Sequence, residues 1–165
     1  MPVRSVGKVS ICSLMSRPDL SARSCCPSAC FKSLGGKRRS LTSKDISETE
    51  NLKTIEHDLE GSSPWPFSSQ TFDGIVVANY LYRPLFSKIL GSLAPKGVLI
   101  YQTFAVGNEK YGRPRNPEYL LSNDELLKVF GKHLHVVQYS HGFIKQPSPA
   151  IMQSICCIND KPLIN

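Results

Sequence analysis

The sequence predicts an α/β fold with a mostly parallel sheet that ends in a C-terminal antiparallel hairpin. The predicted strand 72–78 contains the unbroken apolar run IVVA, which is typical of a strand covered on both faces. After Asn79 and Tyr80 the apolar spacing changes to that of one helix face. Two apolar runs, 135–144 and 150–158, are separated by five residues, short enough to join antiparallel neighbours. Because ligands of open α/β sheets bind at the carboxyl ends of strands, Asn79-Tyr80 is a candidate site.

Turn and breaker residues define the elements around this strand. A helix is predicted at about 82–94, ended by Pro95 and Gly97, and a strand at 97–104 follows it. Ahead of the central strand, residues 54–58 form a short strand candidate that leads into a loop rich in Ser, Pro and Gly.

A long polar segment, residues 105–121, separates this region from the last helix. Its glycines and prolines predict a lack of regular structure, and loops of this length are functional lids or disordered segments. Ser122 and Glu125 have the spacing of a capping box, so they predict a helix start, and Gly131 suits its C-terminal cap. The predicted buried face of this helix consists of Leu126, Leu127 and Phe130.

Charge is distributed unevenly along the 165 residues, which are enough for one domain. Residues 1–43 are predicted to be a basic, poorly ordered segment and residues 44–165 a single α/β domain of nearly balanced charge. The basic segment is rich in Ser and Arg and has one acidic residue, so a mitochondrial transit peptide is one interpretation and a basic tail the other. The expected location is otherwise cytoplasmic.

Neither nucleic acid nor a membrane is an expected partner. The basic run GGKRR offers few phosphate contacts and has no interleaved aromatic residues for base stacking. No run approaches the roughly 18 apolar residues of a membrane helix.

The cysteines do not predict a metal site. Cys25, Cys26 and Cys30 lack a second pair of ligands at zinc-binding spacing. Cys156 and Cys157 are neighbours in a predicted strand, where adjacent side chains point to opposite faces. Buried thiols in a reducing compartment are the expected state, and the histidines show no catalytic pattern.

Several motifs resemble one enzyme family. The order DLEG, PWPF, FDGIVVANYLYRPL and APKGVLIYQTFAVGNEKYGRPRNPEYLLSNDELL is similar to the C-terminal two-thirds of small class I S-adenosylmethionine-dependent methyltransferases, including the tellurite-resistance type. The resemblance covers roughly residues 44–160, and YQTFAVGNEKYGRPRNPEYLL is its most specific part. It implies a Rossmann-like class I methyltransferase sheet with its last strand antiparallel, and a small-molecule or unknown methyl acceptor.

The resemblance also implies positions for the cofactor. Asp45 would hold the ribose hydroxyls of S-adenosylmethionine, and Asp58 with Leu59 the adenine. Asn79 and Tyr80 would face the methionine part and the methyl group. Two alternatives stay open: Asp58 could cap a turn, and Asn79 could cap the following helix. No side chain is implied as catalytic.

The beginning of the family pattern is missing. Residues 22–36, ARSCCPSACFKSLGG, stand where the family has a glycine-rich turn, and no apolar strand precedes them. The missing strand should leave a sheet edge unpaired and weaken cofactor binding. We therefore keep three hypotheses. The first is an active methyltransferase, and the second is a non-catalytic methyltransferase-like binding protein or a truncated or frameshifted product. The third, which has the least support, is a nucleic-acid-associated protein that uses the basic residues 1–43. Reading the nucleotides upstream of Phe31 in the other two frames tests the frameshift, which requires an acidic, glycine-rich stretch there.

Overall fold

The computed structural model describes residues 8–12, 57–61 and 64–160, and of residues 8–12 it describes the backbone. The chain divides into two units, one made of Met1–Leu14 and Phe67–Asn165 and the other of Met15–Pro66. The first unit contains β1 (Lys8–Cys12), β2 (Phe72–Ala78), α2 (Leu85–Ser92), β3 (Leu93–Phe104), η2 (Asn108–Lys110), η3 (Pro117–Tyr119), α3 (Glu125–Phe130), β4 (His135–Ile144) and β5 (Ala150–Ile158). The described residues of the second unit, 57–61 and 64–66, contain no helix or strand. Most of the predicted strand 54–58 lies outside the described residues, which begin again at residue 57.

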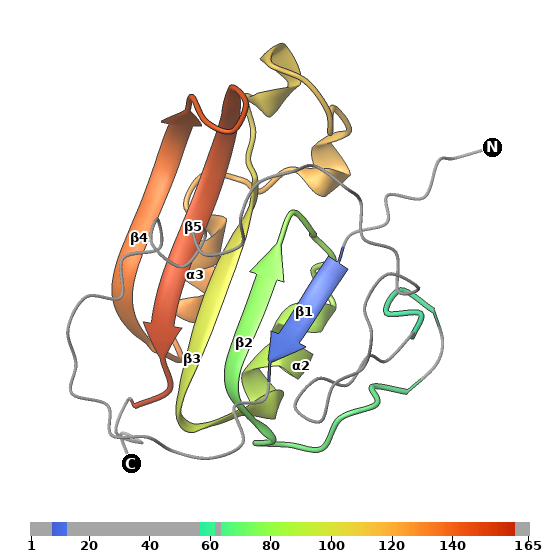
Figure 1. The fold of residues 1–165 in the computed structure, drawn as a ribbon, viewed down its shortest axis with the longest axis vertical. Helices are drawn as coiled ribbons and strands as arrows, with labels where there is room; N and C mark the ends of the chain where they lie inside the picture. The colour runs from blue at the N-terminus through green and yellow to red at the C-terminus, as the bar shows by residue number, and fades with distance from the viewer. Residues whose placement is uncertain (1–7, 13–56, 62–63, 161–165) are drawn as a thin grey trace. The chain divides into compact units, whose positions relative to one another are not determined.

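The five described strands form one sheet in the order β1-β2-β3-β5-β4 (Figure 1). β2 and β3 are parallel, with Val76 opposite Ile100, and β5 is antiparallel to both β3 and β4. The C-terminal hairpin is therefore confirmed. The described sheet is mixed rather than mostly parallel, because one of its four pairings is parallel. A parallel pairing needs a long crossover, whereas the five-residue connection between β4 and β5 forces antiparallel neighbours.

The strand β1 lies within residues 1–43, the segment predicted to be poorly ordered. β1 pairs antiparallel with β2, from Lys8 opposite Ala78 to Cys12 opposite Gly74. The expected unpaired edge of β2 is therefore occupied, because backbone pairing requires no particular side chains. Since β1 runs antiparallel, it ends beside Gly74, away from the C-terminal end of β2. The rest of residues 1–43, including residues 22–36, lies outside the described residues, and the boundary at residue 44 stays a prediction.

The helix predicted at 82–94 is shorter in the structure. Leu85 and Phe86 donate their backbone N–H groups to the carbonyls of Tyr82 and Arg83, so a turn precedes α2. Pro84 occupies the N-cap position. Asn79 does not cap this helix, because α2 begins only at Leu85.

The strand predicted to begin at residue 97 begins earlier. Leu93 pairs with Phe72, and the register shifts between Phe72 and Gly74. Pro95 and Gly97 therefore lie inside β3 and do not form a stop after the helix. The irregular register accommodates the proline, which cannot donate a hydrogen bond to the sheet ladder.

The helices α2 and α3 pack on one face of the sheet. The ring centroids of Phe86 in α2 and Phe130 in α3 lie 5.4 Å apart. The ring centroid of Tyr101 in β3 lies 5.9 Å from that of Phe86 and 5.8 Å from that of Phe130. Figure 1 shows both helices behind the sheet. Within the described ranges, no helix is both long and apolar enough to cross a membrane.

The last helix begins at Glu125, and its predicted buried face is confirmed in part. Leu126 and Phe130 are fully buried, whereas Leu127 is 38% exposed, because the short helix turns this side chain away from the sheet. The predicted capping box does not form, because the N-cap is Asp124 and Glu125 is the first helical residue. The Glu125 carboxylate still accepts a 2.8 Å hydrogen bond from the Ser122 backbone N–H. Gly131 is the C-cap and has a right-handed conformation.

Candidate functional site

The parallel strands β2 and β3 end at the same edge of the sheet, and Asn79 follows β2 directly there. Its backbone N–H donates a 2.8 Å hydrogen bond to the carbonyl of Gln102 in β3, and its side chain is exposed. Its φ of 55° lies in the left-handed region, which is unfavourable for residues other than glycine but is tolerated best by asparagine and aspartate. Such backbone conformations cluster at binding sites.

Tyr80 lies beside Asn79 but is 8% exposed, so its ring belongs largely to the core. The carbonyl of Tyr80 accepts a 2.9 Å hydrogen bond from the buried hydroxyl of Tyr101. Burial raises the pKa of Tyr101 well above its ordinary value, so the phenol stays protonated and remains a donor. The hydrogen bond from Asn79 to Gln102 and the one from Tyr101 to Tyr80 hold the turn against β3.

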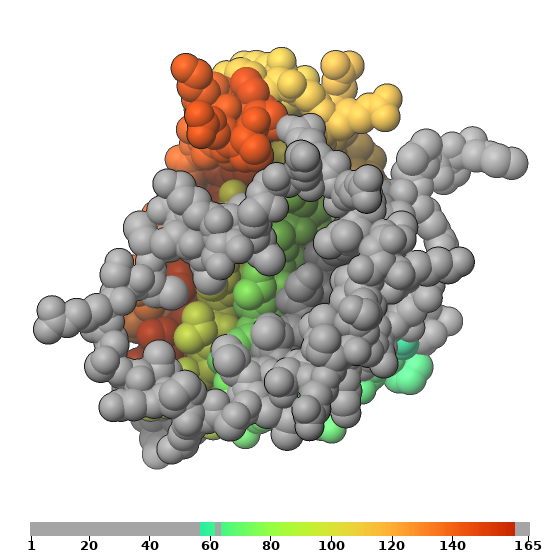
Figure 2. Space-filling model, in the orientation of Figure 1, coloured from blue at the N-terminus to red at the C-terminus, as the bar shows by residue number. Residues whose placement is uncertain are grey.

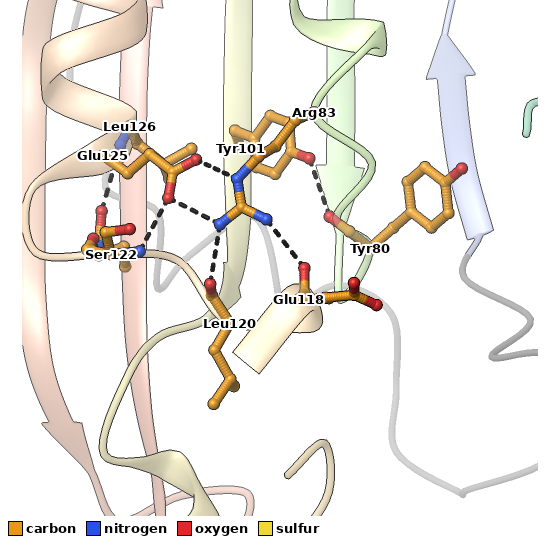
Figure 3. A network of polar contacts seen from close by, with 9 residues as sticks. Tyr80, Arg83, Tyr101, Glu118, Leu120, Ser122, Glu125 and Leu126 are labelled. Carbon is orange, nitrogen blue, oxygen red and sulfur yellow. Dashed lines mark hydrogen bonds and ion pairs between the residues drawn. The ribbon is translucent and has the colours of Figure 1, made fainter. Parts of the chain in front are cut away.

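Arg83 connects this turn to a segment almost forty residues later (Figure 3). Its Nε and Nη2 groups donate to the two carboxylate oxygens of Glu125 at 2.7 and 3.0 Å. Its Nη1 and Nη2 groups also donate to the backbone carbonyls of Glu118 at 2.9 Å and Leu120 at 3.0 Å. We call Arg83 with these three acceptor residues the Arg83 clamp. A planar guanidinium suits this task because its donors form a rigid fork.

The carboxylate of Glu125 is the charged centre of the clamp. Its side chain is 14% exposed, and that of Arg83 is 41% exposed. Burial acts to raise the pKa of Glu125, but the hydrogen bonds from Arg83 and Ser122 outweigh it, so the pKa lies below the ordinary value. The hydrogen bond with Glu125 raises the pKa of Arg83, which stays charged. The clamp is therefore a complete ion pair at neutral pH.

The loop of residues 105–121 follows β3 at the same edge and is compact. Its base is closed, since Val106 donates its backbone N–H to Leu121 at 2.9 Å and Leu121 donates to Phe104 at 3.0 Å. Contrary to the expected lack of regular structure, it contains the 3-10 turns η2 and η3. The loop packs against the end of β4, where Tyr111 and Phe143 have ring centroids 5.1 Å apart, and Figure 2 shows these segments adjoining.

A buried asparagine holds the middle of this loop. Asn108 is 1% exposed, and its Oδ1 accepts a 3.2 Å hydrogen bond from the backbone N–H of Ile151 in β5. Its Nδ2 donates to the carbonyl of Pro114 at 3.4 Å. Gln153 of β5 donates its Nε2 to the carbonyl of Ser122. No sequence pattern points to Arg83, Asn108 or Gln153, because their hydrogen-bond partners include residues distant in the chain.

No described contact joins the other predicted cofactor residues, Asp45, Asp58 and Leu59, to this edge of the sheet. Asp58 is exposed and its Oδ1 accepts a 3.1 Å hydrogen bond from the Glu60 backbone N–H, so it caps a turn. Leu59 is half-buried. Both belong to the unit Met15–Pro66, whereas Asn79 belongs to the other, so an adenine-binding role stays a prediction. Asp45 lies outside the described residues.

The described residues also contain no group of three or more His, Cys, Asp or Glu side chains that could hold a metal ion. Cys156 and Cys157 are both buried in β5.

Comparison with known proteins gives low similarities. No protein-family model matches the chain, and no curated protein sequence matches it. The solved structures to which this chain is similar include S-adenosylmethionine-dependent methyltransferases. One from Methanosarcina mazei has 13% identity and a TM-score of 0.48, over 70% of this chain and 74% of that one. One from Aquifex aeolicus has 15% identity and a TM-score of 0.45, over 67% of this chain and 56% of that one.

TehB from Haemophilus influenzae is a further similar structure, with 12% identity and a TM-score of 0.45, over 56% of this chain and 36% of that one. This chain therefore spans less than two-thirds of the length of TehB and of the Aquifex aeolicus enzyme. Similarities this low assign neither a family nor a function.

Proposed function

We propose that this chain is an S-adenosylmethionine-dependent methyltransferase-like protein whose cofactor site lies at the C-terminal edge of β2 and β3. The observation that carries the proposal is Asn79, whose side chain is exposed at that edge and whose left-handed backbone is held by Gln102. Support comes from the sequence motifs and from the position of the antiparallel β5 beside the parallel pair β2 and β3.

The residues at this edge fit one part of the cofactor. The Asn79 amide can both donate and accept hydrogen bonds, as the amino and carboxylate groups of the methionine part require. S-adenosylmethionine supplies a methyl group that is already activated, so the protein has to bind and orient donor and acceptor. We assign Tyr80, whose ring is buried, a structural role in holding the turn. We assign the 105–121 loop the role of contacting the methyl acceptor.

A second candidate, a non-catalytic methyltransferase-like binding protein, is favoured by the direction of β1. A class I cofactor site needs a turn after the strand beside β2, at the same edge as Asn79. β1 runs antiparallel to β2, so its C-terminal residue Cys12 lies beside Gly74 at the other end. A turn that directly follows β1 is therefore not placed beside Asn79.

Calorimetric titration with S-adenosylmethionine and S-adenosylhomocysteine tests the proposal. Asn79→Gly removes the amide and keeps the left-handed backbone, so it should weaken binding about tenfold or more, as for a lost hydrogen bond to a charged group. Gln138→Ala removes an exposed amide from β4 and should bind like the wild type. No heat and no thermal shift at millimolar cofactor would reject the proposal. Wild-type binding by Asn79→Gly would reject the assigned site.

The two candidate functions differ in turnover. Incubation of the protein with S-adenosylmethionine carrying a labelled methyl group, and with small-molecule extracts, should label an acceptor if the chain is a methyltransferase. Cofactor binding without labelling of any acceptor supports the non-catalytic protein.

A further inference from the structure

We propose that Arg83 is a positioning residue that makes the 105–121 loop a fixed wall of the candidate site rather than a mobile lid. This inference depends on the proposed function only where it names the ligand. The contacts that support the inference lie within the protein and require no ligand.

The first step is the geometry of the Arg83 clamp. One guanidinium forms four hydrogen bonds, two to the carboxylate of Glu125 and two to the carbonyls of Glu118 and Leu120. The bonds to Glu125 are charge-assisted and therefore stronger than neutral ones. Glu118 belongs to the 3-10 turn η3, so Arg83 attaches the C-terminal part of the loop to the turn that carries Asn79.

The second step is that the loop is also attached at two other places. Its base is closed by the hydrogen bonds between Val106, Leu121 and Phe104, and its middle is held by the buried Asn108. A lid opens by a change of backbone conformation at hinge residues near its base. Arg83 holds Glu118 and Leu120, directly before the base residue Leu121, so a hinge movement there would break the clamp.

The third step is that lysine cannot replace arginine in this arrangement. A lysine ammonium is a single point donor on a flexible stem and cannot address a carboxylate and two carbonyls in one plane. Arg83→Lys therefore keeps the charge and the apolar stem but removes the fork. Arg115, an exposed arginine of the same loop, makes no hydrogen bond to another residue of the described ranges, and Arg115→Lys is the matched control.

Hydrogen exchange of the ligand-free protein tests the inference. In Arg83→Lys the backbone amides of Leu120 and Leu121 should exchange at least about tenfold faster, because local opening no longer breaks the full clamp. The amides of β3 and β5 should keep their wild-type rates. Arg115→Lys should exchange like the wild type throughout. Ile89→Val, in the buried face of α2, lowers overall stability without touching the clamp and should not accelerate these two amides selectively.

A second variant keeps the test decisive if Arg83→Lys does not fold. Glu125→Gln retains the side-chain shape and the two carbonyl contacts but removes the ion pair, so it should accelerate the same amides to a smaller extent. The inference is wrong if neither variant differs from Arg115→Lys. It is also wrong if S-adenosylhomocysteine slows loop exchange about tenfold in the wild type, since that slowing would show a loop that closes on its ligand.

Titration with S-adenosylhomocysteine separates this inference from the proposed function. If the wild type binds, Arg83→Lys should bind more weakly than Ile89→Val under conditions where both are folded, because the wall is displaced in the first variant only. If the wild type does not bind, the proposed function fails, whereas the exchange rates of the ligand-free protein still decide the role of Arg83.

Discussion

At the scale of single residues, Asn79 shows how a backbone conformation and a candidate binding role coincide. The chain leaves β2 and turns at once toward α2, and the left-handed φ of 55° at Asn79 makes that change of direction. Glycine would adopt this conformation more easily, but it offers no amide to a ligand. We therefore interpret the asparagine as a compromise between backbone strain and a polar group at the sheet edge.

Substitutions at Asn79 should separate these two properties. Asn79→Ala should lower the free energy of unfolding by about 1 kcal/mol, because alanine is disfavoured in the left-handed region. Asn79→Gly should stay closer to the wild type, because glycine carries no such penalty there. Urea denaturation of both variants measures the difference. The strain interpretation fails if Asn79→Ala is as stable as Asn79→Gly.

Glu125 should make stability depend on acid pH. Its pKa is lowered in the folded protein, because the hydrogen bonds from Arg83 and Ser122 outweigh burial. A lowered folded-state pKa gives stability that is present above the ordinary value of 4.5 and is lost as the pH falls through the folded-state pKa. Urea denaturation at neutral pH and near pH 3 should therefore show that acid lowers the free energy of unfolding less in Glu125→Gln than in the wild type. Equal losses would contradict this assignment.

At the scale of elements, β1 shows that an unpaired sheet edge can be satisfied by an unexpected segment. The five residues Lys8–Cys12 pair with β2 along most of its length, from Ala78 to Gly74. Hydrogen bonds between backbones do not depend on side-chain identity, so this pairing leaves no motif in the sequence. Its direction decides which end of β1 lies near Asn79.

Proline substitutions should show whether β1 forms this pairing. In an antiparallel pair, neighbouring residues point their N–H groups alternately toward and away from the partner strand. Of Val9→Pro and Ser10→Pro, one should therefore lower the free energy of unfolding by about 1–3 kcal/mol through a lost ladder hydrogen bond, and the other should have a smaller effect. Thermal denaturation measures both, and each variant is the control for the other. Two equal, negligible effects would rule out the β1 pairing.

At the scale of the whole molecule, three aromatic rings join the described elements that come from distant parts of the sequence. Phe86 of α2, Tyr101 of β3 and Phe130 of α3 lie within ring-contact distance of one another. Tyr101 also reaches the carbonyl of Tyr80, and its burial keeps it protonated. The same cluster therefore supports the core and the turn of the candidate site.

Truncation of Phe130 should be among the most destabilising single changes in this core. Phe130→Ala should lower the free energy of unfolding by about 3–5 kcal/mol, because the cavity lies between two helices and the sheet. Leu127→Ala, on the same helix but 38% exposed, should cost less than about 1 kcal/mol. Urea denaturation of both variants provides the comparison. Similar losses in the two variants would show that the cluster does not hold the core together.

The local elements and their periodicity can be predicted from short stretches of the sequence. Strand 72–78, the C-terminal hairpin, the buried Leu126 and Phe130 and the contact between Ser122 and Glu125 all follow from spacing within short windows. Sequence also singled out Asn79 by its place after a buried strand. These predictions succeed because each depends on residues that are close together in the chain.

The folded chain was needed to reveal the pairing of β1 with β2, the early start of β3 at Leu93 and the contacts of Arg83. Each joins residues that are far apart in the chain or lack a side-chain signature, and so none leaves a periodic pattern. The Arg83 guanidinium pairs with a carboxylate 42 residues later, because the folded geometry brings the two together and residues 74–92 around Arg83 contain no acidic side chain.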